Sequence, residues 1–216
     1  MSVDVKICGL STPETVTAAL EAGADLVGFN FYPKSPRYVS PPKAGELARL
    51  ARGRARIVAL VVDAEDSLID EITRAVDPDF FQVQGSESPE RTAEIRERSG
   101  KPVIKVIKVR TQDDVAQTRA YDGIAALILY DAKAPETLKD ALPGGNGIAF
   151  DWKLLRQGNA AAGFLLAGGL NPGNVVEAIR VTGAPIVDVS SGVEKSPGIK
   201  DITLIREFIA AAKGPR

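Results

Sequence analysis

The sequence predicts an α/β protein with a single domain, a (β/α)8 TIM barrel spanning residues 1–216. Short apolar runs alternate with longer amphipathic segments, a pattern typical of parallel strands joined by helices. About eight such units fit into 216 residues, and no linker rich in Pro, Gly or Ser divides the chain. The predicted strands are residues 3–8, 25–31, 56–62, 79–84, 103–109, 125–130, 164–167 and 186–190.

Several of the intervening helices have recognisable ends. Ser11-Thr12-Pro13 supplies a hydroxyl cap and an early proline, and Gly23 predicts the end of that helix. Two late helices are predicted to begin at Asn171-Pro172 and after Lys200-Asp201. Their predicted inward side chains are Val175, Val176 and Ile179 in the first, and Ile205, Phe208 and Ile209 in the second.

Composition excludes several classes of function. The net charge of −1 provides no basic field for nucleic acid or an anionic membrane surface. No apolar stretch approaches the roughly 18 residues of a membrane helix. The single cysteine excludes an internal disulfide and predicts a reducing, cytoplasmic location. Because the chain has no histidine, acid–base chemistry must come from cysteine, carboxylates, lysine or tyrosine, and histidine metal sites are excluded.

Active-site groups of a (β/α)8 barrel lie where the strands end, so the strand ends are the places to search. The first strand ends at Cys8, and its alternation turns Lys6 and Cys8 toward the barrel interior. Gly9 allows the backbone to turn away from the thiol. A lone cysteine is more often a small buried core residue. A role as a base would require a lowered pKa, for which Lys6 is a candidate cause.

The sixth strand ends in four apolar residues followed by Asp131, which places a carboxyl group at the mouth of the barrel. This residue is either a proton donor or a turn and capping aspartate. After it comes a long polar loop with a glycine cluster at residues 144–147, which is either a lid or a turn.

Glycines and serines follow the last two strands, where barrels of this class frequently bind phosphate. Backbone N–H groups and hydroxyls there would act as donors, although the same residues also suit ordinary turns. The candidate phosphate-binding residues are Gly168, Gly169, Ser190, Ser191 and Gly192.

Two further candidates follow the second and fourth strands. Arg37 lies in a proline-rich loop and would clamp a carboxylate through paired hydrogen bonds, or else be a solvated surface residue. Gln84 would donate to a substrate, or pair with the neighbouring Gln82.

Taken together, the segments 5–10, 33–38, 144–152, 166–174 and 188–201 resemble the phosphoribosylanthranilate isomerase family of tryptophan biosynthesis. The resemblance implies the cofactor-free Amadori rearrangement of N-(5-phosphoribosyl)anthranilate to 1-(2-carboxyphenylamino)-1-deoxyribulose 5-phosphate. It further implies Cys8 as general base, Asp131 as general acid, Arg37 as partner of the anthranilate carboxylate, and Asp188 near the sugar hydroxyls. It also implies that Gly169, Ser191 and Gly192 hold the phosphate.

The chain departs from the family pattern at two positions. Many members carry histidine where this chain has Gln84, and threonine is commoner where it has Asn146. The amide of Gln84 keeps a hydrogen-bond donor but removes a titratable group.

Alternative functions are another phosphosugar-acting barrel enzyme or a non-catalytic barrel that binds a phosphometabolite. An epimerase would need histidine metal ligands. A synthase would need catalytic lysine and glutamate, and Lys105 and Lys108 have no matching glutamate pattern. The expected partner is a small phosphosugar, and the oligomeric state is either monomer or homodimer.

Overall fold

The barrel is closed by eight parallel strands that follow one another in chain order. A computed structural model describes residues 3–135, 143–156, 160–161 and 163–214. The predicted fold class is therefore confirmed, and each predicted strand agrees with an observed one to within two residues. The barrel strands are β1 (Asp4–Cys8), β2 (Leu26–Asn30), β3 (Arg56–Val61), β4 (Phe80–Val83), β5 (Val103–Val109), β6 (Leu127–Ala132), β7 (Leu165–Leu166) and β8 (Ile186–Val189).

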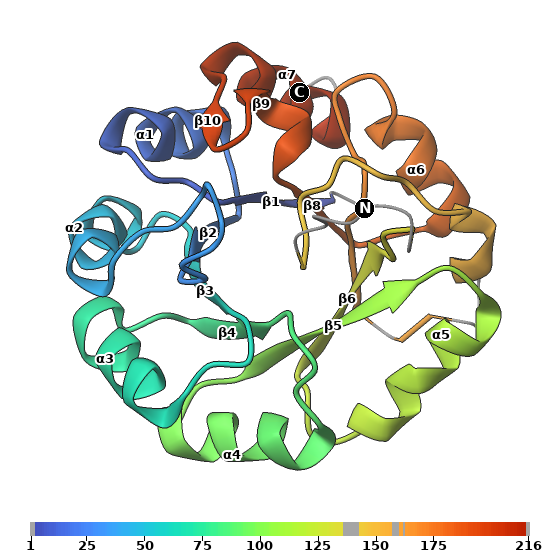
Figure 1. Cartoon of the computed structure of the whole chain (residues 1–216). Helices are drawn as coiled ribbons and strands as arrows, with labels where there is room; N and C mark the ends of the chain where they lie inside the picture. The colour runs from blue at the N-terminus through green and yellow to red at the C-terminus, as the bar shows by residue number, and fades with distance from the viewer. Residues whose placement is uncertain (1–2, 136–142, 157–159, 162, 215–216) are drawn as a thin grey trace.

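A ring of helices surrounds these strands (Figure 1). The ring contains α1 (Pro13–Ala22), α2 (Pro41–Ala51), α3 (Asp66–Val76), α4 (Pro89–Ser99), α5 (Gln112–Ala116), α6 (Val175–Thr182) and α7 (Ile202–Lys213). Short 3-10 helices are η1 (Gln117–Tyr121), η2 (Trp152–Leu155) and η3 (Ser191–Val193), and a two-stranded hairpin of β9 (Glu194–Ser196) and β10 (Ile199–Lys200) follows β8. None of the helices within the described ranges is both long and apolar enough to span a bilayer.

The predicted ends of the first helix are confirmed by its capping geometry. Thr12 is the N-cap, and its side-chain oxygen accepts a hydrogen bond from the N–H of Thr15 at 3.4 Å. Gly23 ends the helix with φ at 95°, a conformation that glycine adopts without steric cost.

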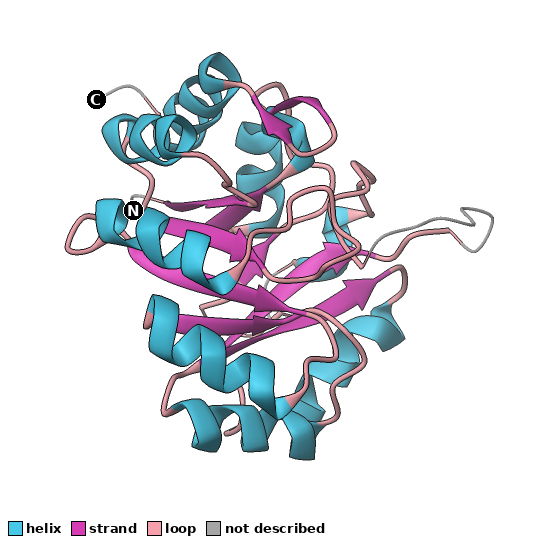
Figure 2. Ribbon diagram, turned by 60° about the vertical axis from the view of Figure 1, so that its left-hand side comes forward, coloured by secondary structure: helices cyan, strands magenta, loops and turns pink. Residues whose placement is uncertain are grey.

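The connection from β6 to β7 differs from the regular pattern of alternating strand and helix. Among the described residues it contains only the 3-10 helix η2 and no α-helix. The sequence explains part of the difference, because Pro143 and three glycines among residues 144–147 disfavour a helix. The barrel strands β1 to β8 point toward the same end of the barrel (Figure 2), and residues 143–148 line the cavity at the carboxyl ends of these strands.

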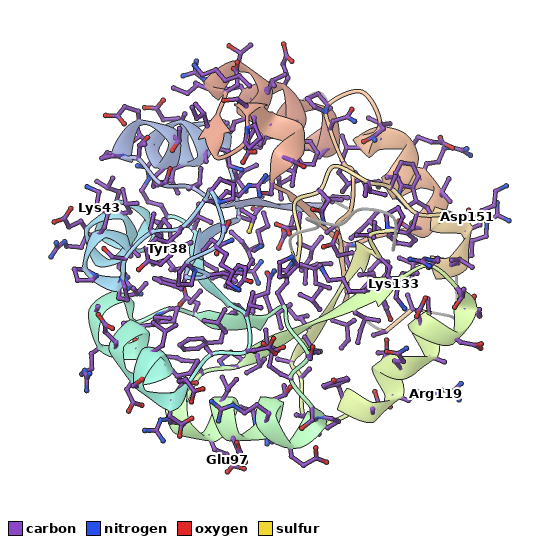
Figure 3. The ribbon with its side chains drawn as sticks, in the orientation of Figure 1. Tyr38, Lys43, Glu97, Arg119, Lys133 and Asp151 are labelled. Atoms are coloured by element: carbon purple, nitrogen blue, oxygen red, sulfur yellow. The ribbon has the colours of Figure 1, made fainter. Side chains whose placement is uncertain are left out.

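The core has two parts, separated by the barrel wall. Val5 and Ile7 lie in the larger part, between strands and helices, as the alternation in the first strand predicted. The smaller part is a buried cluster made by Leu26, Val58, Ile104, Val106, Leu129, Leu165, Ala167 and Ile186. Lys6, on the face of β1 opposite Val5 and Ile7, is fully buried. Charged side chains on the helices point away from the barrel, as Lys43, Glu97 and Arg119 do in Figure 3.

One predicted core residue is wrong. The helix that follows Asn171 begins at Val175, and its buried residues are Val175, Ala178 and Thr182, whereas Val176 is 59% exposed. Successive helical residues are rotated by about 100°, so Val176 cannot share the face of Val175. The inward residues predicted for α7, Ile205, Phe208 and Ile209, are all buried.

This pair of adjacent valines gives a matched test of the packing. We expect Val175→Ala to lower the free energy of unfolding by about 2 kcal/mol, because it removes buried methyl groups and leaves a cavity. We expect Val176→Ala to change it by less than about 0.5 kcal/mol, as for an exposed position. Urea unfolding followed by circular dichroism measures both, and equal effects would contradict the assigned faces.

Candidate active site

A cavity opens at the carboxyl ends of the strands, and nine of the ten predicted site residues line it. The exception is Gly192. A Cβ atom at that position would lie 1.8 Å from the carbonyl oxygen of Leu170, so the glycine permits close packing between the loops after β7 and β8. The predicted residues that line the cavity are Cys8, Arg37, Gln84, Asp131, Gly168, Gly169, Asp188, Ser190 and Ser191.

Cys8 lies in the cavity wall and is only 4% exposed. It ends β1, and Gly9 turns the chain with φ at 77°. On the adjacent strand, Gly28 makes room for it, since a Cβ atom there would lie 3.1 Å from the Cys8 sulfur and 3.3 Å from Cε of Lys6. The thiol is therefore both a buried side chain and part of a cavity, and these two interpretations of a lone cysteine are not exclusive.

The charges around Cys8 oppose its burial. Burial raises the pKa of the Cys8 thiol, the nearby charge of Lys6 lowers it, and the net result is a raised pKa. Lys6 thus acts in the direction that a role as base requires, but desolvation is the larger effect.

Lys6 and Asp188 form a buried ion pair next to this thiol. The Lys6 ammonium donates to Oδ1 of Asp188 at 2.8 Å, and their side chains are 0% and 8% exposed. Burial opposes the charge on Lys6, but the negative charge of Asp188 carries the pKa of Lys6 above its usual value. Burial also raises the pKa of Asp188, against the attraction of Lys6.

Asp131 lies at the end of β6, with its carboxylate held from three sides. Its Oδ2 accepts from Nζ of Lys108 at 2.9 Å and from Nε2 of Gln84 at 3.4 Å, and its Oδ1 accepts from its neighbour's backbone N–H. Gln84 is oriented by Gln82, whose Nε2 donates to Oε1 of Gln84 at 2.6 Å. Gln84 therefore pairs with Gln82, as one of its two interpretations predicted, and it also lines the cavity.

Arg37 is buried in the site rather than solvated at the surface, with 4% of its area exposed. Its Nε and Nη2 donate to the carboxylate of Glu194 at 2.7 and 2.8 Å. Lys200 donates to the same carboxylate at 2.7 Å and to the backbone oxygen of Ser190 at 2.8 Å. This Arg37–Glu194–Lys200 cluster joins the loop after β2 to the hairpin after β8.

The glycine loops have the backbone shapes that close approach requires. Gly168 and Gly169 have φ at 86° and 66°. A Cβ atom on either would meet backbone atoms at 2.7 Å, so only glycine fits. The segment 143–148 closes over the same space, since Gly144 lies against Gln84 and Gly145 against Arg37.

The structure places in this site three residues that were assigned no role there from the sequence. Lys108 was considered only for another activity, and Glu194 and Lys200 lie on a hairpin beyond the last barrel strand. Alternation along β5 would have turned Lys108 inward together with Val106, but no sequence pattern pairs Glu194 with Arg37 across 157 residues.

The geometry combines one thiol, two carboxyl groups and a guanidinium in a single cavity with glycine- and serine-bearing loops. Within the described residues, no group of three or more cysteines and carboxylates could hold a metal ion. Proton transfer is the chemistry that this set of side chains can perform. Together, the fold and the cavity define a (β/α)8-barrel enzyme whose site suits a small anionic substrate.

Comparison with known proteins identifies the family. The family model for N-(5'-phosphoribosyl)anthranilate (PRA) isomerase matches residues 5–211, and the chain belongs to that family. It is 51% identical over 213 residues to N-(5'-phosphoribosyl)anthranilate isomerase of Rhizobium johnstonii, which covers 99% of this chain and 95% of the relative.

Solved structures give the same result. The crystal structure of phosphoribosyl anthranilate isomerase from Thermotoga maritima is 38% identical, with a TM-score of 0.87 over 99% of this chain and 100% of that one. A phosphoribosyl anthranilate isomerase in complex with reduced 1-(o-carboxyphenylamino)-1-deoxyribulose 5-phosphate is 36% identical, with a TM-score of 0.84 and the same coverage.

The raised pKa of Cys8 can be measured by alkylation, since the chain has one cysteine. The thiolate is the nucleophile, so the rate of reaction with iodoacetamide rises with pH as the thiol ionises. We expect the midpoint of this rise to lie above pH 8.5, which is about the pKa of an exposed cysteine. Mass spectrometry of the modified chain gives the rate, and an unfolded sample in urea supplies the reference midpoint. A midpoint below that reference would contradict the dominance of burial.

Proposed function

We propose that the chain catalyses the Amadori rearrangement of N-(5-phosphoribosyl)anthranilate to 1-(2-carboxyphenylamino)-1-deoxyribulose 5-phosphate in tryptophan biosynthesis. The observation that carries the proposal is that Cys8, Asp131 and Arg37 line one cavity. A thiol and a carboxyl group can share two proton transfers, and a buried guanidinium selects a carboxylate. Family membership supports the same reaction.

The reaction proceeds through two proton transfers. Asp131, in its protonated form, donates a proton to the furanose ring oxygen, and the C1′–O bond breaks as the nitrogen lone pair forms a protonated imine. Cys8, in its thiolate form, then removes the proton from C2′. The C2′–H electron pair forms the C1′=C2′ double bond, and the C=N electron pair moves to the nitrogen to give an enolamine. Tautomerisation of the enolamine yields the ketone. Each positioned transfer contributes roughly 10²–10⁴-fold to the rate.

The two ends of the cavity suit the two anionic groups of this substrate. Nη1 of Arg37, which has no hydrogen-bond partner among the described residues, receives the anthranilate carboxylate. Gly168, Gly169, Ser190 and Ser191, with the backbone N–H of Gly192, receive the phosphate. Asp188, between these ends, accepts hydrogen bonds from the sugar hydroxyls. Holding both ends fixes the reacting carbon near the thiol and lowers the entropic cost of reaction.

The same residues bear on the oligomeric state, the cellular location and the cofactor requirement of the enzyme. One chain supplies all the residues of the proposed site, so either a monomer or a homodimer would be active. The single buried thiol, which must stay reduced to act, suits the cytoplasm. The side chains proposed here perform both proton transfers without a cofactor.

Substitution of the two proposed catalytic residues tests the mechanism. We expect Cys8→Ala and Asp131→Asn each to lower kcat by about 10²–10⁴-fold, because each removes one proton transfer. The assay follows the fluorescence of the anthranilate group with freshly generated N-(5-phosphoribosyl)anthranilate.

Asp70→Asn is a matched control, since it breaks an aspartate–arginine pair with Arg98 on the protein surface. It should leave kcat unchanged. Full activity in either site variant would remove that residue from its role, and no turnover by the unmodified chain would refute the proposed function.

A further inference from the structure

Glu194 is the residue whose position the proposed reaction does not explain. It begins β9, outside the barrel, yet its side chain is only 3% exposed. Its Oε1 accepts hydrogen bonds from Nε of Arg37 and from Nζ of Lys200, both at 2.7 Å, and its Oε2 accepts from Nη2 of Arg37 at 2.8 Å. A buried carboxylate shared by two buried cations is costly to assemble, so its place in the site calls for a functional reason.

The contacts with Arg37 and Lys200 keep Glu194 in its ionised form. Burial opposes its ionisation, but the hydrogen bonds from Arg37 and the charge of Lys200 hold the pKa of Glu194 below its usual range. Lys200 in turn is buried, with a lowered pKa that the charge of Glu194 partly restores. The carboxylate is therefore fixed from two sides, by Arg37 on the loop after β2 and by Lys200 on β10.

Glu194 also determines which edge of Arg37 faces the cavity. The guanidinium is planar, and the carboxylate occupies its Nε–Nη2 edge in the paired geometry typical of arginine and glutamate. Gly9 packs against the aliphatic stem of Arg37, since a Cβ atom there would lie 2.7 Å from its Cδ. With one edge and the stem fixed, the Nη1 end points toward Gly145 at the cavity wall.

We propose that Glu194, anchored by Lys200, is a positioning residue that aims Arg37 at the carboxylate of the substrate. This inference rests on the proposed function, in which Arg37 binds that carboxylate. Electrostatic attraction alone predicts the opposite effect, because removing the charge of Glu194 would leave Arg37 with a stronger attraction for an anion. The two expectations differ in sign, so a binding measurement decides between them.

The measurement compares two ligands that differ only in the carboxyl group. One is reduced 1-(o-carboxyphenylamino)-1-deoxyribulose 5-phosphate, and the other is the same compound with an unsubstituted phenyl ring. The ratio of their dissociation constants, from calorimetry on the full chain, reports the contribution of the carboxylate alone. We expect Glu194→Gln to reduce this ratio by about tenfold, the size of one charged hydrogen bond. A general loss of structure would weaken both ligands and leave the ratio unchanged.

Two further variants make the result specific. Glu194→Asp keeps the charge but is one methylene shorter, so it cannot hold Arg37 and Lys200 together at the observed distances, and we expect an intermediate ratio. It also serves where Glu194→Gln fails to fold. Glu177→Gln, which breaks an exposed glutamate–arginine pair on α6, is the matched control and should keep the ratio of the unmodified chain.

The outcomes separate the two levels of inference. If the unmodified chain shows no preference for the carboxylated ligand, or if Arg37→Met retains that preference, the role of Arg37 in the proposed function fails. If Arg37→Met abolishes the preference while Glu194→Gln keeps or increases it, the positioning role of Glu194 is overturned and Arg37 retains its role.

Discussion

The buried ion pair between Lys6 and Asp188 is the constraint on which the site depends. These residues are register partners on β1 and β8, the two strands whose pairing closes the barrel. Removing either partner would leave an isolated buried charge, which typically costs about 3–5 kcal/mol. The pair therefore fixes the closure of the barrel and places a permanent ammonium group beside Cys8.

The same pairing of charges continues to the mouth of the cavity. Lys108 is paired with Asp131, and Glu194 is shared by Arg37 and Lys200. Among the residues that the structure describes here, four cations thus face three carboxylates, which leaves one positive charge in excess. This local excess helps a chain of net charge −1 to attract a substrate that carries both a phosphate and a carboxylate. It also keeps each buried charge within reach of an opposite one.

The sequence contained the barrel and most of its site because both follow from local rules. Alternation placed Lys6 and Cys8 inside, and strand ends located Asp131 and the glycine loops. The rest depended on contacts that no local pattern encodes. Val176 was misplaced because two adjacent apolar residues leave the phase of a short helix undetermined. Glu194 and Lys200 act through a hairpin whose position becomes visible only when the chain is folded, and the balance of burial against charge at Cys8 requires the three-dimensional environment.

Because the chain has no histidine, the side chain that donates a hydrogen bond to Asp131 from the end of β4 is an amide, which does not titrate. The amide of Gln84 is held by Gln82 and donates to Asp131 and to the carbonyl of Pro143. An amide does not titrate, so its hydrogen bond to Asp131 keeps the same polarity at every pH at which the fold persists. Changes of activity with pH must then arise from the groups that gain or lose protons in the cavity itself. The chain thus separates the orientation of Asp131, which Gln84 supplies, from the proton transfers that we assign to Asp131 and Cys8.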